Sequence, residues 1–258
     1  MGSALLSGIL TKNIIKTNSI HIVEPNKSNI KKYRKYKLSF YKKISDVSIK
    51  QLKINTILLA VKPQIAEQVI ADLKLILDKK VLLISVIAGK NVNFYEKLLS
   101  IKNIVRAMPN TPAEVGKGIT ALYSKHEISK KNLTFVNNLF LAVGEVVWIK
   151  KEKDIHIVTA ISGSGPAYVF KFIEIMIKSG IKAGLKPKIS ERLVKNTLMG
   201  SSILAFESTF EVKRLREDVT SPGGTTEAAI AILEDKNQFS KIIDIAIQSA
   251  IKRSTELS

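Results

Sequence analysis

One short stretch of the chain carries residue types suited to holding an anion. Residues 219–226 read VTSPGGTT and combine a proline and two glycines with the hydroxyls of Thr220, Ser221, Thr225 and Thr226. The EAAIAILE that follows predicts a helix. Glycine lets backbone approach a ligand closely, and the free N–H groups at a helix N-terminus attract a carboxylate or phosphate. A simple helix cap needs only one hydroxyl, so the surplus favours an anion site.

Three further segments have residue types typical of loops, and they stand at predicted strand or helix ends, where ligands commonly bind. SGSGPAY (162–168) is rich in Gly and Ser, and Pro166 stands just inside the start of a predicted helix, where proline is tolerated. Its glycines either serve a ligand or permit close helix packing. AVKPQ (60–64) and RAMPNTP (106–112) each follow a predicted buried strand. Ligands of open parallel sheets bind beyond such strand ends, but each signal is weak alone.

The elements that must position these loops differ between the two halves of the chain. Up to about residue 150, five runs dense in Ile, Val and Leu predict buried strands, at 20–24, 56–61, 81–87, 103–108 and 145–150. Helical patterns stand between them, among them 66–78 and 130–144. This alternation predicts a mostly parallel sheet with helices on both faces, a doubly wound domain of the nucleotide-binding type.

After about residue 151 the strand pattern stops and long helices follow. Helices are predicted at 166–185, 189–208 and 239–257, and the first is apolar around nearly its whole circumference. Such a helix needs a cover, either from its own domain or from a partner chain. Because this half has too few residues to cover its own apolar surface, we expect it to dimerise.

Composition excludes several kinds of chemistry. The chain has no cysteine, which rules out disulfides and thiolate sites, and its three histidines, His21, His126 and His156, are scattered, so no metal site is expected. Its apolar runs are far shorter than the roughly 20 residues of a membrane helix. The first ten residues lack the basic flank of a secretion signal. We therefore expect a soluble, cytoplasmic protein without a membrane partner.

The net charge of +19 raises the question of nucleic acid. Lysines are spread along the whole chain rather than gathered with aromatic residues in one patch, so no nucleic-acid partner is expected. The one dense cluster is NKSNIKKYRKYK (26–37). It is either a solvated basic face or a site that attracts a phosphorylated small molecule.

Taken together, the four loops resemble those of the Δ1-pyrroline-5-carboxylate reductase family. AVKPQ, MPNTP, SGSGPAY and TSPGGTT match that family's markers almost letter for letter, and the likeness runs from Met1 to the C-terminus. The resemblance implies a dinucleotide-binding Rossmann-like domain at 1–151. It also implies an all-α dimerisation and substrate-binding domain at 152–258, in a homodimer or higher homo-oligomer.

The activity implied by the resemblance is the final step of proline biosynthesis. This reaction is the reduction of 1-pyrroline-5-carboxylate to L-proline by hydride transfer from NADPH or NADH. Ser221 and the N–H groups of Gly224 and Thr225 would hold the substrate carboxylate. Thr226 would act as the catalytic residue by hydrogen-bonding the ring nitrogen, and Glu152 matches a position that contacts substrate. No strong acid or base is needed, because the nicotinamide carries the chemistry.

The resemblance also implies a set of cofactor-binding residues. They are Gly2, Glu24, Ala60, Val61, Lys62, Pro63, Val86, Ala88 and Asp218. Those from 60 to 88 would lie at the nicotinamide end. Glu24 ends a predicted strand, where an acid favours the ribose hydroxyls of NAD. Asn26 and Lys27 follow directly and favour a 2′-phosphate, so we expect NADP, with NAD as the alternative.

The chain departs from this family's pattern at its start. The family opens with a strand and a G-x-G-x-x-G turn before the first helix, and only Gly2 remains of those glycines. The first strand of the fold is therefore missing in this chain. Because a missing central strand leaves neighbouring backbone groups unpaired, we expect the strand to be encoded upstream of Met1. The alternatives are a genuine short chain that binds dinucleotide poorly and a decaying gene product.

Two other functions stay open on the sequence. One is a non-catalytic protein that binds a carboxylate or amino acid with the helical half and has lost its cofactor site. The other is a different two-domain dehydrogenase that acts on a small acid. Oxidation of NAD(P)H on addition of the cyclic imine distinguishes the reductase from this dehydrogenase.

Overall fold

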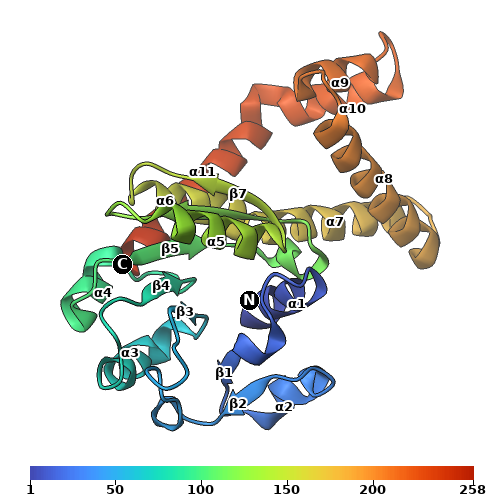
Figure 1. Cartoon of the computed structure of the whole chain (residues 1–258). Coiled ribbons are helices and arrows are strands. Elements are labelled where there is room, and N and C mark those ends of the chain that lie inside the picture. The colour runs from blue at the N-terminus through green and yellow to red at the C-terminus, as the bar shows by residue number, and fades with distance from the viewer. The chain divides into compact units, whose positions relative to one another are not determined.

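The computed structural model describes the whole chain, residues 1–258, which divides into two compact units (Figure 1). Unit 1 comprises Met1–Ser164 together with Ala250–Ser258, and unit 2 comprises Gly165–Ser249. The domain boundary proposed after residue 151 stays a prediction; it precedes the point at which the compact units divide. No helix combines the length and the apolar content that crossing a bilayer requires.

All strands of the protein belong to unit 1. They are β1 (His21–Val23), β2 (Ser39–Tyr41), β3 (Thr56–Leu59), β4 (Leu82–Ser85), β5 (Ile104–Met108), β6 (Gly118–Tyr123) and β7 (Gly144–Trp148). Five of them correspond to the predicted runs. β2 and β6 were not predicted, because β2 has only three residues in a lysine-rich stretch and β6 opens with a glycine and carries a threonine.

The strands form two sheets, one of β1–β2 and one of five strands in the order β3-β4-β5-β6-β7. Every neighbouring pair is parallel except β5–β6, which confirms the mostly parallel arrangement. β1 pairs only with β2, and β3 pairs within its sheet only with β4. No strand of the chain pairs with both β1 and β3, so the two sheets stay separate.

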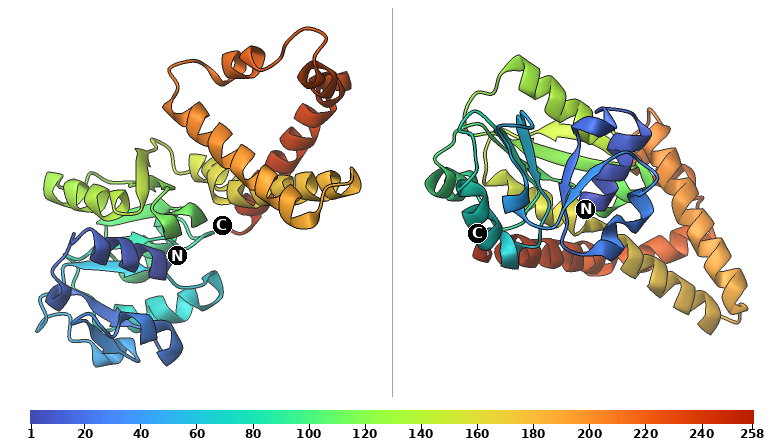
Figure 2. Two further views of the ribbon diagram at one scale, coloured as in Figure 1. Left: turned by 90° about the vertical axis from the view of Figure 1, so that its right-hand side faces the viewer. Right: turned by 60° about the horizontal axis from the view of Figure 1, so that its bottom comes forward.

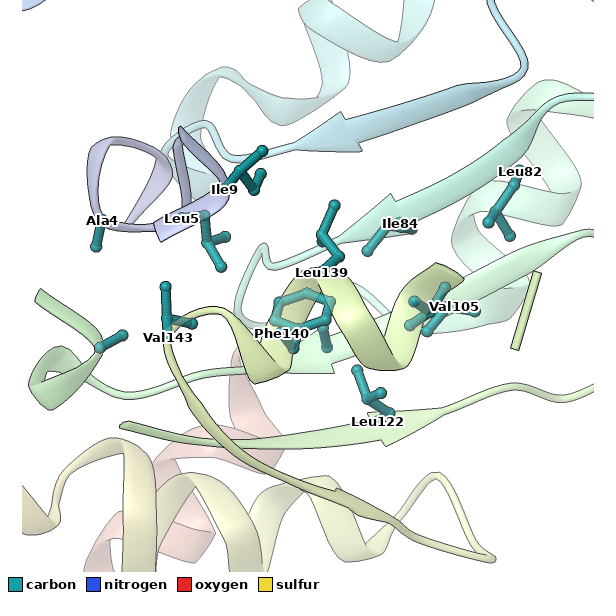
Figure 3. Packing of buried hydrophobic residues seen from close by; sticks show 13 residues of the cluster. Ala4, Leu5, Ile9, Leu82, Ile84, Val105, Leu122, Leu139, Phe140 and Val143 are labelled. Carbon is teal, nitrogen blue, oxygen red and sulfur yellow. The ribbon is translucent and has the colours of Figure 1, made fainter. Parts of the chain in front are cut away.

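Helices cover both faces of the larger sheet. Those of unit 1 are α1 (Gly2–Thr11), α2 (Lys27–Ile30), α3 (Ala66–Lys74), α4 (Val92–Leu99), α5 (Lys130–Leu141) and α6 (Asp154–Val158). One core cluster joins α1 and α5 to one face of the strands, where Phe140 is fully buried. In Figure 3, Leu5 of α1 and Leu139 of α5 both lie against the strands. A second cluster joins α3 and α4 to the opposite face.

The two faces follow from the alternation of side chains along each strand. In β4, Leu82 and Ile84 pack toward α1 and α5, while Leu83 packs toward α3 and α4. Successive strand residues point to opposite faces, so a strand covered on both sides is apolar throughout. All four residues of β4 are accordingly buried. This is why the buried strands could be recognised as continuous apolar runs.

Unit 2 is entirely helical, as predicted. It contains α7 (Gly165–Lys182), α8 (Pro187–Glu207), α9 (Val212–Asp218), α10 (Thr225–Glu234) and most of α11 (Gln238–Glu256), whose end belongs to unit 1. α7 and α8 contact each other and diverge from the short turn that joins them (Figure 2). The buried Ser190 donates a hydrogen bond to the carbonyl of Ile177 at 2.9 Å, and Gly180 leaves room for its hydroxyl. These helices keep large apolar side chains exposed.

Candidate functional site

Most of the predicted cofactor-binding residues lie on neighbouring loops of unit 1. β3, β4 and β5 run parallel, so the loops after them emerge at one edge of the sheet, where ligands of open sheets bind. Residues 60–63 follow β3, and Val86 and Ala88 follow β4. The N–H of Val86 donates to the carbonyl of Leu59 at 3.0 Å. A Cβ built on Gly2 would lie 3.1 Å from the Cβ of Ala60, so α1 begins at the same place.

Glu24 directly follows β1, and its carboxylate accepts a hydrogen bond from the backbone two residues further along the chain. Its Oε1 accepts the N–H of Asn26 at 2.9 Å, and the Asn26 Oδ1 accepts the N–H of Ser28 at 3.0 Å. Beside this turn is an open cavity of about 530 Å³, lined by Ser3, Ser28, Asn29, Lys31 and Lys32. The lining holds two ammonium groups and no carboxylate, so the cavity suits an anion such as a phosphate.

The RAMPNTP and SGSGPAY loops contact each other within unit 1. The Asn110 Nδ2 donates to the hydroxyl of Ser162 at 3.3 Å, and Ser162 lies in the π-helical turn Thr159–Gly163. A Cβ on Gly163 would lie 2.6 Å from the Cε of Met108. At Gly163 the observed contact is therefore close packing, which was one of the two explanations for these glycines.

The TSPGGTT loop joins α9 to α10 in unit 2. Gly224 is the N-cap of α10, and its N–H donates to the carbonyl of Ser221 at 3.0 Å. Gly223 has a φ of +72°, a conformation that favours glycine. The backbone N–H groups of Thr225 and Thr226 have no acceptor in the chain. The free donors of this loop are therefore at 225 and 226, and the Gly224 N–H is already engaged in the turn.

Some charged groups and hydroxyls around this loop form hydrogen bonds or ion pairs within the chain, and others do not. Glu227 Oε2 accepts the N–H of Gly223 at 2.7 Å, and the Thr220 hydroxyl donates to the carbonyl of Arg216 at 2.7 Å, at the end of α9. Asp218 forms an ion pair with Arg214 at 2.8 Å. The hydroxyls of Ser221, Thr225 and Thr226 have no hydrogen-bond partner in the chain. Three of the four hydroxyls are thus free to meet a ligand.

The predicted site residues therefore form two groups. Unit 2 holds Asp218, Ser221, Gly224, Thr225 and Thr226 on one loop, and unit 1 holds the remaining predicted cofactor residues and Glu152. The structure brings the five residues of the unit 2 group onto one segment, and in unit 1 it brings Gly2 close to Ala60 and the loop after β4 close to the end of β3. The roles of the individual residues stay predictions. No cluster of His, Asp or Glu side chains is arranged to hold a metal ion.

Glu152 is engaged in a contact that the sequence did not indicate. Its Oε1 accepts a hydrogen bond from Arg106 Nη1 at 3.0 Å and another from the N–H of Val92 at 2.7 Å. Arg106 is 3% exposed and belongs to β5. A buried charge requires a partner, so the lone arginine in the otherwise apolar run NIVRAM was the signal that could have revealed this pair.

Other buried polar groups surround this ion pair. The hydroxyls of Tyr95 and Ser85 are 2.6 Å apart, and both residues are fully buried. Burial raises the pKa of Tyr95 to about 12, so its hydroxyl is neutral. Burial, and next the positive charge of Arg106, lower the pKa of His156. Because the Tyr95 hydroxyl is neutral, Glu152 is the member of this group whose negative charge pairs with Arg106.

Two domain families match the chain. Residues 152–257 match the family described as pyrroline-5-carboxylate reductase dimerisation, and residues 1–89 match NADP oxidoreductase coenzyme F420-dependent. The first match covers the helices of unit 2 and the loop at 219–226. The second covers the chain from α1 to the loop after β4.

Relatives and solved structures agree with these matches. A pyrroline-5-carboxylate reductase from Haemophilus influenzae is 40% identical over 80% of this chain and 76% of that protein. One from Synechocystis is 35% identical over 100% of this chain and 94% of that protein. The crystal structure of the Plasmodium falciparum pyrroline carboxylate reductase with NADP bound aligns with a TM-score of 0.84 and 36% identity, over 100% of this chain and 94% of that one.

A second solved structure gives the same result across both halves of the chain. The pyrroline-5-carboxylate reductase of Coxiella burnetii aligns with a TM-score of 0.89 and 33% identity, over 100% of this chain and 94% of that one. Likeness of this extent includes the strand-end loops of unit 1 as well as the glycine-threonine loop of unit 2. The chain therefore belongs to the pyrroline-5-carboxylate reductase family.

Proposed function

We propose that this chain reduces 1-pyrroline-5-carboxylate to L-proline with NADPH, the final step of proline biosynthesis. One observation carries the proposal beyond family membership: α10 begins with the free N–H groups of Thr225 and Thr226 beside three free hydroxyls. A small acid with one carboxylate and one ring nitrogen needs such a set of neutral donors and acceptors. No strong acid or base stands in the loop apart from Glu227, which caps Gly223.

Within this proposal, the loop of unit 2 binds and orients the imine. The Thr225 N–H and the Ser221 hydroxyl donate to the substrate carboxylate, where the partial positive charge of the α10 N-terminus adds attraction. The Thr226 hydroxyl oxygen accepts the N–H of the protonated ring nitrogen. This bond favours the iminium, which is a better hydride acceptor than the neutral imine. Holding the imine in one orientation supplies most of the rate enhancement.

NADPH supplies the hydride, and the residues of unit 1 fit its shape and charge. The strand-end loops at 60–63 and 86–88 provide backbone and small side chains for the nicotinamide end, and the N-terminus of α1 at Gly2 suits phosphate. The cation-lined cavity at Lys31 and Lys32 suits a further phosphate at the other end. These features favour NADP over NAD, with Glu24 engaged by its own backbone turn.

The activity is tested by following NADPH absorbance when 1-pyrroline-5-carboxylate is added to the purified chain. We expect oxidation of NADPH and the formation of one L-proline for each NADPH consumed. Binding of L-proline without any turnover would support the non-catalytic alternative. Turnover of a hydroxy or keto acid in place of the imine would support a different dehydrogenase.

Lys31→Ala is expected to raise the KM for NADPH about 5- to 10-fold while leaving the KM for NADH unchanged. The reason is that a lysine ammonium in an open cavity contributes about 1 kcal/mol to binding a phosphate, less than a buried contact would. Lys35→Ala is the matched control, since Lys35 belongs to the same basic cluster but does not line the cavity. Equal rises in both KM values would show that Lys31 does not bind the 2′-phosphate that distinguishes NADPH from NADH.

The helical unit provides the association surface of a homodimer in this proposal. Large apolar side chains stay exposed on its helices, including Phe170 (63%) on α7, Phe206 (80%) on α8 and Ile245 (68%) on α11. Many large apolar side chains left exposed on the helices of one unit favour a protein interface there. We expect sedimentation equilibrium to give at least twice the chain mass of 28.6 kDa. A monomer at micromolar concentration would contradict the dimer.

The remaining parts of the proposal concern location and partners. The cysteine-free chain suits the reducing cytoplasm, where NADPH is also available. Besides a second copy of the chain, its partners are the small-molecule substrate and cofactor. Fractionation of cells that express the protein, with an antibody against it, tests the location.

A further inference from the structure

A row of polar side chains crosses the middle of the larger sheet. Ser85 of β4 pairs in register with Arg106 of β5, and Arg106 pairs with Tyr123 of β6. Residues directly opposite one another on paired strands point to the same face. That face is the one covered by α4, whose Tyr95 reaches Ser85. A polar row beneath a helix in an otherwise apolar core calls for a reason beyond packing.

The ion pair in this row reaches the start of α4. Glu152 Oε1 accepts from the Arg106 guanidinium and also from the N–H of Val92, the first residue of α4. The Asn91 side chain caps the Phe94 N–H of the same helix at 2.9 Å. A carboxylate at a helix N-terminus is favoured by the helix dipole. Glu152 therefore contacts the backbone at the point where α4 begins.

The other end of the same loop is held by Ser85. Its Oγ accepts a hydrogen bond from the N–H of Ile87 at 3.2 Å and forms another hydrogen bond with the hydroxyl of Tyr95 at 2.6 Å. Loop 86–91 thus runs between two backbone N–H groups held by side chains, that of Ile87 by the buried Ser85 and that of Val92 by the partly buried Glu152. This loop contains Val86 and Ala88, which the proposed function places near the nicotinamide.

We infer that Arg106 and Glu152 are positioning residues that hold loop 86–91 in the conformation that receives the nicotinamide end of NADPH. This inference rests on the proposed function. Arg106 carries the charge that keeps the Glu152 carboxylate in place, and Glu152 transmits that position to the backbone at Val92. An apolar pair of similar volume would fill the core equally well, but it would leave the Val92 N–H without its acceptor.

This assignment differs from the role that the family resemblance suggests for Glu152. A residue that contacts substrate directly affects the imine, whereas a residue that acts through loop 86–91 affects the cofactor. Both hydrogen bonds of Glu152 to the chain use the same oxygen, Oε1, and its side chain is 21% exposed. The two roles therefore have to be distinguished by measurement.

The experiment uses the full chain with Glu152→Ala and Glu152→Gln. Glutamine keeps an oxygen that accepts the Val92 N–H but loses the charge that Arg106 attracts. Three quantities are measured: hydrogen exchange at the amides of 86–92 without ligand, the Kd for NADPH by fluorescence titration without substrate, and the KM for the imine. The matched control is Glu96→Ala, because Glu96 pairs with Lys125 at 2.7 Å from a later turn of α4.

For Glu152→Ala we expect faster exchange at Val92, a Kd for NADPH raised about 10-fold and an unchanged KM for the imine, since small displacements of a binding loop weaken the ligand geometry. Glu152→Gln should recover part of both losses, because its amide oxygen still accepts the Val92 N–H, and Glu96→Ala should change neither. Arg106→Met should reproduce the effect of Glu152→Ala on exchange at Val92.

Two results would overturn the inference. One is a raised KM for the imine with unchanged exchange and unchanged Kd for NADPH, which would make Glu152 a substrate contact. The other is a uniform loss of stability and binding that Glu152→Gln does not recover, which would make the pair purely structural. If the unmodified chain itself binds no NADPH, the proposed function fails and the cofactor role of the pair fails with it. In that case hydrogen exchange still shows whether Glu152 holds the loop.

Discussion

Gly224→Val is expected to raise the KM for 1-pyrroline-5-carboxylate about 100-fold or more. A Cβ at this position would lie 2.6 Å from the Ser221 Oγ and 2.9 Å from the Ser221 carbonyl oxygen, so the turn must open. Opening it moves both Ser221 and Thr225 away from the substrate carboxylate. Each hydrogen bond to a charged group contributes about 1.5–3 kcal/mol, and the loss of two corresponds to about 100-fold or more in affinity.

The test is steady-state kinetics on Gly224→Val together with its thermal unfolding midpoint. Gly200→Val is the matched control, because Gly200 lies in α8 with no atom within 4 Å of an added Cβ. The control should keep its KM for the imine. An unchanged KM in Gly224→Val would place the substrate carboxylate at another loop.

Thr226→Ala is expected to lower kcat about 100-fold while leaving the protein folded. Removing one preorganised hydrogen-bonding group at a reacting centre typically costs about 10²–10³ in rate. The Thr226 hydroxyl has no partner in the chain, so its removal should cost little stability, at most about 1 kcal/mol. The measurement is kcat at saturating imine and NADPH, alongside the unfolding midpoint.

Two further substitutions isolate the Thr226 hydroxyl. Thr226→Ser keeps a hydroxyl at the same position and should retain most of the activity. Thr220→Ala removes the hydroxyl that donates to the carbonyl of Arg216, so it should affect the end of α9 and leave kcat intact. A kcat for Thr226→Ala equal to that of the unmodified chain would remove Thr226 from the mechanism.

The fold could largely be predicted from the sequence, because its elements carry strong local patterns. Strands buried on both faces appear as unbroken apolar runs, and all five long helices predicted match observed helices to within about four residues at each end. The weak signals were missed. β2 is too short, and α4 stands in the mixed stretch VNFYEKLL, whose polar residues interrupt the apolar run.

The candidate site could be predicted only as separate loops. The motifs AVKPQ, MPNTP, SGSGPAY and TSPGGTT were found because each combines glycine, proline or hydroxyl residues at the end of an element. Their partners were not found. Nothing near Glu152 in the sequence indicates Arg106, which precedes it by more than forty residues, and the Ser85–Tyr95 bond depends on how α4 packs on β4.

The sequence by itself determined the family, the two kinds of architecture and the residue types at the substrate loop, since these depend on local patterns and on composition. Only the tertiary structure decided which donors are free. It engages the Gly224 N–H within its own turn, pairs Asp218 with Arg214, and places the Glu152 carboxylate between a buried arginine and the start of α4. The physical reason is that hydrogen bonds and ion pairs depend on distances between residues remote in sequence, which only the folded backbone sets.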